Sequence, residues 1–141
     1  MKARTIGYWV TTVLVALAFA AGGAGDLSHG PDMVAGMAHL GYPVYFLTIL
    51  GVWKVLGALA IVVPKFPRLK EWAYAGMIFD LTGAAASHAA SGDDAGKVIT
   101  PLVIGLLVAA SWALRPAART LKPLFADAPQ GASATKSPAL A

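Results

Sequence analysis

The sequence predicts an all-α membrane protein, a polytopic four-helix bundle with a short amphipathic helix in its first exterior loop. Of its 141 residues, 57% are hydrophobic and only 13% are charged, whereas soluble domains carry roughly 25% charged residues. The mean hydropathy is +0.66. Four apolar segments are long enough to span a bilayer, and the basic residues flank them at alternate ends. These three observations fix the fold class.

The four spans are defined by length and by the residues that interrupt them. A bilayer core about 30 Å thick requires about 20 apolar residues in a helix. The connector "PKFPRLK" contains two prolines and three cations, and "SGDDAGK" is a short polar turn. The predicted spans cover residues 6–24, 43–63, 72–90 and 98–114. We therefore predict a transmembrane domain over residues 1–116 and, from its small polar composition, a disordered cytoplasmic tail over residues 117–141.

The first span also resembles a secretory signal, because Lys2 and Arg4 precede it and "AFAAGG" offers small residues for cleavage. Its apolar stretch is longer than the 7–15 residues of a typical signal sequence. We therefore expect a retained membrane helix.

The distribution of cations predicts the orientation of the chain. Eight of them fall on one side of the four spans, and only Lys97 lies in a connector on the opposite side. By the positive-inside rule, we expect a multi-pass protein with both termini cytoplasmic. The eight cations are Lys2, Arg4, Lys65, Arg68, Lys70, Arg115, Arg119 and Lys122.

The composition also excludes several classes of function. There is no cysteine, so disulfides, thiol chemistry and cysteine metal sites are excluded. The basic residues do not form a patch interleaved with aromatics, so nucleic acid is not a partner. The sequence contains no nucleophile elbow, P-loop, zinc-protease motif or dinucleotide fingerprint. Its three histidines lack metal-ligand spacing, and no metal site is predicted.

The exterior loop between the first two spans contains the segment "PDMVAGMAHL". Pro31 suits the first position of a helix and Gly41 suits the position just past its end. Met33, Val34 and Met37 form an apolar stripe along it. We expect a helix that lies at the exterior surface or caps the bundle.

Two charges interrupt the second and third spans near their midpoints. Lys54 and Asp80 each lie about ten residues from the exterior end, or roughly 15 Å deep. An unpaired charge at the centre of a membrane helix costs roughly 2.5–3.5 kcal/mol on insertion scales. We therefore predict that Lys54 and Asp80 form an intramembrane ion pair. This pair either only fixes the register of the two helices or handles a ligand or protons.

Small residues accompany these charges and predict close helix packing. Gly51 and Gly57 flank Lys54, and Gly83 follows Asp80. In the first span a similar stripe repeats every four residues, at Thr12, Ala16, Ala20 and Ala24.

From Asp80, Ser87 and His88 continue towards the exterior, which predicts a polar slot that opens there. His29 and His39 fit ordinary loop residues. The candidates for ligand binding or proton handling are Lys54, Asp80, Ser87, His88, Asp26 and His39.

Several motifs of this sequence are similar to those of one family. The segments "AHLGYP" and "LGVWKVLGALAIVVPKFPRLKEWAYAGMIFDLTGAAASHAA" resemble the DoxX-like family of small bacterial membrane proteins, over about Tyr8 to Pro116. The resemblance is carried by Lys54, Gly57, Glu71, Trp72, Tyr74, Asp80, Thr82, Gly83, Ser87 and His88.

The resemblance implies a location in the bacterial inner membrane. It also implies a link to quinones or electron transfer, because one relative is named for a subunit of a thiosulfate:quinone oxidoreductase. The sequence itself has no haem or iron–sulfur ligation pattern, so redox partners would supply the electron carriers. Three functions follow as hypotheses: a membrane subunit that binds a quinone or similar lipophilic molecule, a stand-alone membrane enzyme such as an isomerase, and a non-catalytic anchor or assembly module. The expected partners are membrane lipids, a soluble or membrane redox protein, and further copies of the chain in a homo-oligomer.

Overall fold

The computed structural model describes residues 2–121, and within them every regular element is helical, as predicted. Residues 122–141 hold most of the predicted disordered tail and lie outside the described residues. The first residues of the predicted tail, Ala117–Arg119, form a short 3₁₀ helix. The elements are α1 (Lys2–Ser28), α2 (Pro31–His39), α3 (Tyr45–Val62), α4 (Pro67–Ala90), α5 (Ala95–Ala113) and η1 (Ala117–Arg119).

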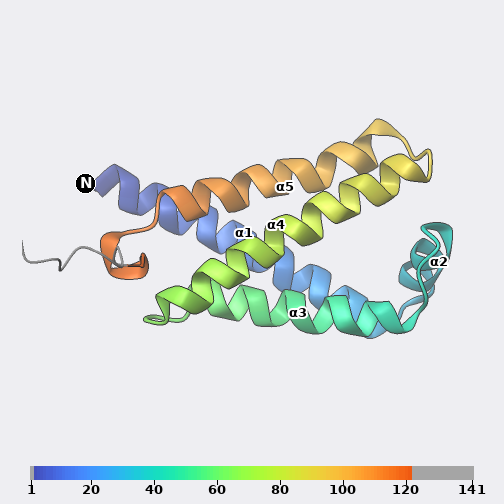
Figure 1. Cartoon of the computed structure of the whole chain (residues 1–141), viewed down its shortest axis with the longest axis horizontal. Helices are drawn as coiled ribbons and strands as arrows, with labels where there is room; N and C mark the ends of the chain where they lie inside the picture. Colours follow the sequence, from blue (N-terminus) through green and yellow to red (C-terminus); the bar gives the residue numbers. More distant parts are fainter. Residues whose placement is uncertain (1, 122–141) are drawn as a thin grey trace, which may run out of the picture.

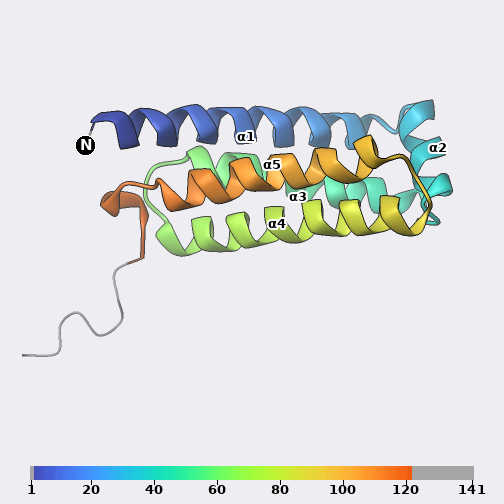
Figure 2. The same ribbon diagram turned by 90° about the horizontal axis from the view of Figure 1, so that it is seen from above.

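The four long helices form a bundle in which each packs on two neighbours. Helix α1 packs against α3 and α5, and α4 packs against the same two helices from the other side (Figures 1 and 2). Successive long helices run in opposite directions. The start of α1, the α3–α4 turn and the end of α5 therefore lie at one end of the bundle, called here the basic end. Helix α2 and the α4–α5 turn lie at the other end, called the α2 end.

Three of the helices, α1, α3 and α5, are long and apolar enough to cross a membrane. Helix α4 has the length but not the hydropathy, because Asp80, Thr82 and His88 interrupt it. The helices also begin and end at different residues from the predicted spans. Helix α1 extends four residues beyond the predicted span at each end, and α4 begins at Pro67 rather than at residue 72.

Helix α1 faces the bundle with a different stripe from the predicted one. Ala20 and Ala24 are exposed, so the predicted stripe of small residues does not pack as a unit. The buried side follows residues spaced three or four apart, as expected for one face of a helix. Its members are Tyr8, Thr12, Val15, Phe19, Gly23 and Asp26.

The interior combines an apolar core with one hydroxyl cluster. Thr12 Oγ1 and Tyr74 Oη lie 2.7 Å and 2.8 Å from Ser111 Oγ, and all three side chains are buried. Such hydrogen bonds between helices stabilise membrane bundles, because apolar lipid offers no polar alternative. The apolar core consists of Val15, Phe19, Ala58, Ile61, Tyr74, Met77, Leu81 and Val108.

Helix α2 lies across one end of the bundle, which agrees with the prediction of a short helix between the first two spans (Figure 2). It begins at Pro31, and Gly41 just past its end has a φ of +79°, a left-handed conformation that favours glycine. None of its side chains is buried, so α2 covers the end of the bundle without joining its core.

Helices α1 and α3 approach most closely where two glycines meet, at Gly23 and Gly51. A Cβ atom added at Gly51 would lie 2.9 Å from the carbonyl oxygen of Gly23 and 2.6 Å from Leu27 Cγ. The backbone carbonyl cannot move aside as a flexible side chain would. The prediction that Gly51 lies in a close helix contact is therefore confirmed.

We expect Gly51→Ala to destabilise the bundle by about 1–3 kcal/mol, because the added methyl group forces α1 and α3 apart. Thermal unfolding in detergent measures this change. Gly83→Ala is the matched control, because nothing lies within 4 Å of a Cβ at that position. Equal melting temperatures for the two variants would contradict the close approach of α1 and α3.

Candidate functional site

Lys54 lies midway along α3, nine residues after Tyr45, and its ammonium group faces two carboxylates. Its Nζ atom is 2.8 Å from Asp26 Oδ2 and 4.0 Å from Asp80 Oδ2. The nearer partner is therefore Asp26 of α1, which forms a charged hydrogen bond with Lys54. The predicted partner, Asp80 of α4, lies at the limit of ion-pair distance and beyond hydrogen-bond distance.

Asp26 reaches Lys54 because α1 continues four residues beyond the predicted span, which ended at residue 24. Gly23 allows α1 to lie directly against Gly51, and the helix ends only near His29, whose φ is +49°. Asp26 lies three residues after Gly23 and seven after Phe19, so it continues the buried stripe of α1. This spacing in the sequence could have identified Asp26 as a second carboxylate that faces Lys54.

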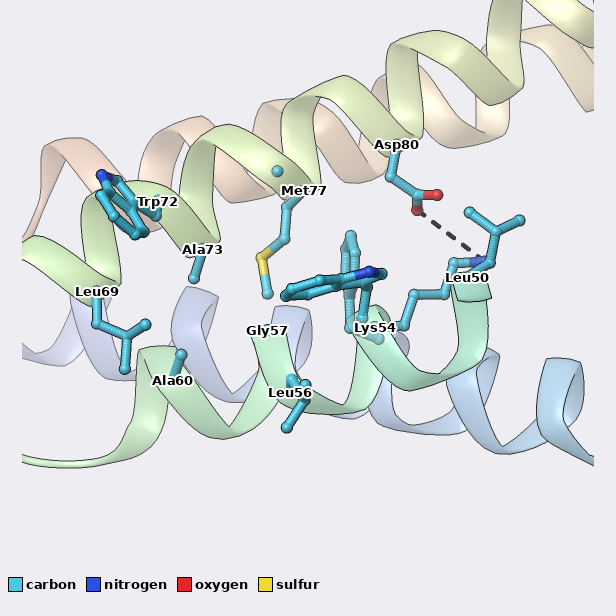
Figure 3. Close-up of a pocket in the computed structure, with 13 residues that line it drawn as sticks. Leu50, Lys54, Leu56, Gly57, Ala60, Leu69, Trp72, Ala73, Met77 and Asp80 are labelled. Atoms are coloured by element: carbon cyan, nitrogen blue, oxygen red, sulfur yellow. Dashed lines mark ion pairs between the residues drawn. The ribbon is translucent and has the colours of Figure 1, made fainter. Parts of the chain in front are cut away.

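A pocket of about 430 Å³ lies between α3 and α4, next to this cluster of charges (Figure 3). Among residues 2–121, Lys54 and Asp80 are the only charged residues that line it, and both lie towards one end of it. From them the pocket extends towards the basic end of the bundle, as far as Ala60 and Leu69. The lining residues are Phe19, Leu50, Trp53, Lys54, Leu56, Gly57, Ala60, Leu69, Trp72, Ala73, Gly76, Met77 and Asp80.

The walls of the pocket are apolar, and part of them faces outwards. Trp53 and Trp72 are 68% and 78% exposed, so they form the outer rim between α3 and α4. Gly57 packs against Met77, whereas nothing lies within 4 Å of a Cβ at Gly76. The absence of a side chain at Gly76 therefore leaves open volume in the pocket.

The other predicted site residues lie apart from this pocket, at the α2 end. Ser87 Oγ lies 2.9 Å from Tyr42 Oη and also donates to the carbonyl oxygen of Gly83. His88 Nδ1 and His39 Nε2 lie 2.7 Å and 3.0 Å from the carboxylate of Asp93. The structure thus groups Lys54, Asp26 and Asp80 in one site, and His39 and His88 in another.

Asp93 connects three elements through its carboxylate. It accepts hydrogen bonds from His88 on α4, Lys97 on α5 and His39 on α2. These bonds, with that from His88 contributing most, hold the pKa of Asp93 well below its usual range. While Asp93 is ionised, these hydrogen bonds therefore hold α2 against the α4–α5 turn.

Because the pKa of Asp93 is lower in the folded state, its contribution to stability is present above the ordinary carboxyl pKa of about 4 and is lost as the pH falls below that value. We expect Asp93→Asn to unfold at a lower temperature than the wild type at pH 7, and the difference to shrink below about pH 4. Thermal unfolding as a function of pH measures this. Asp32→Asn is the control, and a difference independent of pH would contradict the assignment.

Sequence analysis missed that three cations at the basic end are buried or half-buried in the structure. Lys70 is fully buried and donates to the carbonyl oxygens of Ala60, Ile61 and Val63 at the end of α3. A cation is favoured there because the last carbonyls of a helix are unpaired and carry partial negative charge. The position of Lys70 a few residues after Pro64, which ends the preceding helix, could have predicted that this lysine binds the end of α3.

Arg115 and Arg119 complete this group. Arg115 is only 4% exposed, lies 2.8 Å from a carboxylate oxygen of Glu71, and stacks on Tyr74 and Trp112. Arg119 of η1 donates to Tyr8 Oη and to two carbonyl oxygens at the end of α3. These contacts join the end of α5 to the rest of the bundle, so they have a structural role.

Within residues 2–121, no three histidine, aspartate or glutamate side chains are grouped so that they could hold a metal ion. The α3–α4 pocket presents one ammonium group, one carboxyl group and apolar walls, and the carboxylate of Asp26 bonds to the same ammonium group.

Comparison with known proteins relates the chain to one family. The model of the DoxX-like family matches residues 10–111, which include most of the bundle and the whole pocket. A protein of Bacillus subtilis (strain 168), "Uncharacterized protein YdgD", is 35% identical over 77 residues, which cover 55% of this chain and 67% of that protein. No solved structure shows a significant match. With its all-helical bundle and its three apolar spans, this chain is an integral membrane protein that belongs to the DoxX-like family.

Proposed function

We propose that this protein binds a small lipophilic molecule with a polar head, such as a quinone, in the pocket between α3 and α4. The observation that carries the proposal is an apolar pocket of about 430 Å³ with Lys54 and Asp80 towards one end. Small-molecule sites typically have volumes of about 300–1,000 Å³, apolar walls and a few convergent polar groups. An apolar tail would lie against the walls, with the polar head at the charges.

The groups at that end of the pocket suit a quinone. A quinone carbonyl oxygen accepts hydrogen bonds, and Lys54 has N–H groups besides the one that it gives to Asp26. Trp53 and Trp72 on the rim offer flat apolar surfaces for a ring. When bound, a quinone would supply redox chemistry, and the chain's own residues would hold its head and exclude water from it.

Under this proposal the pocket lies within the inner membrane, open sideways to lipid. Lys54 is about 14 Å along α3 from Tyr45, which places it near the middle of a bilayer core about 30 Å thick. The basic end of the bundle carries the start of α1, the α3–α4 turn and Arg115, and it would face the cytoplasm. The lipophilic molecule would then enter from the bilayer between Trp53 and Trp72.

Association with a redox complex completes the proposal, and the resemblance to proteins linked to quinone chemistry supports it. The chain has no cysteine to ligate an iron–sulfur cluster. Electrons would therefore come from a partner protein, and this chain would supply the site for the lipophilic molecule.

A substitution that fills the pocket with a side chain tests whether the pocket binds the ligand. Gly76→Leu adds a side chain where a Cβ meets open space in the pocket, so the variant is expected to fold. Titration of the purified protein with a short-chain quinone, followed by tryptophan fluorescence, reports binding through Trp53 and Trp72. We expect at least a tenfold loss of affinity in Gly76→Leu, equivalent to about 1.4 kcal/mol.

Gly83→Leu is the matched control, since it lies seven residues along the same helix, has equally open surroundings and does not line the pocket. It should bind the quinone as the wild type does. Equal quenching of tryptophan fluorescence in all three proteins would show that the quinone partitions into the detergent or lipid and does not bind in this pocket. That result would contradict the proposal.

A further inference from the structure

The cluster around Lys54 carries one positive and two potentially negative groups. Asp26 and Asp80 face the same ammonium group from α1 and α4, on either side of α3. Helix α5 adds no ionisable side chain between residues 98 and 113, and the nearest ionisable groups on α4 are Tyr74 and His88, which bond elsewhere. With both carboxylates ionised, the cluster would have a net charge of −1.

The two carboxylates differ in their hydrogen bonds. Asp26 accepts a 2.8 Å hydrogen bond from Lys54 and is only 6% exposed. Asp80 accepts no hydrogen bond from the residues that the structure describes, and its closest cation is 4.0 Å away. An ionised carboxylate that lacks donors is unfavourable beside apolar walls, and a neutral carboxylic acid is not.

From this geometry we infer that Asp26 neutralises Lys54 and that Asp80 holds a proton at neutral pH. The pocket then presents two donors, the Lys54 ammonium group and the Asp80 carboxylic acid, at one end of an apolar cavity. Two donors beside each other select a neutral ligand with an acceptor oxygen, such as a carbonyl compound, and disfavour a lipophilic cation. The ligand class rests on the proposed function, whereas the proton on Asp80 can be tested without any ligand.

Infrared spectroscopy of the full-length protein in lipid nanodiscs at pH 7 tests for this proton. We expect a carboxylic acid C=O band that shifts when the sample is transferred to D₂O. Asp80→Asn should abolish the band. Asp26→Asn should abolish it as well, because Asp80 then becomes the only carboxylate facing Lys54 and ionises. Asp32→Asn, on the exposed surface of α2, is the control and should leave the band unchanged.

A wild-type protein without the band would overturn the inference, and this result requires no variant to fold. A band that survives in folded Asp80→Asn would place the proton on another group, and one that survives in Asp26→Asn would refute the pairing of Asp26 with Lys54. If the protein binds quinone but lacks the band, Asp80 is not protonated and the proposed function still holds. If the band is present but quinone does not bind, Asp80 is protonated and the proposal of a quinone ligand is wrong.

Discussion

Replacing Lys54 by methionine is expected to destabilise the bundle by about 3–5 kcal/mol, because it leaves the buried carboxylate of Asp26 without its cation. Removing the nearer carboxylate as well should restore more stability than removing the farther one. We therefore expect Lys54→Met/Asp26→Leu to unfold at a higher temperature than Lys54→Met/Asp80→Leu. Thermal unfolding in detergent, with the single variants to complete both double-mutant cycles, measures the two coupling energies.

The cycles also distinguish the sequence-based pairing from the one in the structure. A larger coupling of Lys54 to Asp26 than to Asp80 is expected from distances of 2.8 Å and 4.0 Å. A larger coupling to Asp80 would contradict the structure at this site and restore the pair predicted from sequence. No measurable coupling to either aspartate would show that Lys54 is solvated.

The second large effect is expected at the basic end. Glu71→Leu removes the only carboxylate paired with Arg115, whose guanidinium is almost fully buried, among the residues that the structure describes. Leaving a buried charge without its partner typically costs about 3–5 kcal/mol. We expect a loss of that order in thermal unfolding.

The control for this loss is Arg68→Leu, which removes an exposed charge on the same turn of α4. The double variant Glu71→Leu/Arg115→Met should recover part of the lost stability, because no unpaired charge remains. If Glu71→Leu unfolds at the same temperature as Arg68→Leu, Arg115 does not depend on Glu71.

The four long helices could be predicted from sequence because each signal was local. Apolar length, prolines and the alternation of basic flanks located every helix to within a few residues. The same signals located α2, with Pro31 at its start and Gly41 just past its end. These features require no knowledge of which helices touch.

The contents of the site could be predicted only in part. Lys54 and Asp80 were identified because a charge in an apolar span must be compensated. Such a charge can be recognised from the sequence alone. Asp26 was not paired with Lys54 because the predicted span ended at residue 24. In the bundle Gly23 packs closely against Gly51, and α1 continues past that contact to the aspartate.

The direction of the pocket could not be predicted either, because it depends on which side chains fill the space between α3 and α4. Ser87 and His88 share a helix with Asp80, which suggested a polar slot towards the α2 end. In the structure those two residues bond to Tyr42 and Asp93, and the open space lies towards the basic end. Helical spacing gives the face of a residue but not whether a neighbouring side chain fills the space beside it.

The central claim is that the α3–α4 pocket holds a lipophilic molecule, and native mass spectrometry with lipid extraction tests it most directly. The protein is purified gently from membranes as wild type, Gly76→Leu and Gly83→Leu. We predict a small hydrophobic molecule bound to the wild type and to Gly83→Leu, and absent from Gly76→Leu. A wild type without such a molecule, or one that remains equally bound in Gly76→Leu, would contradict the account and favour an assembly module held together by its buried ion pairs.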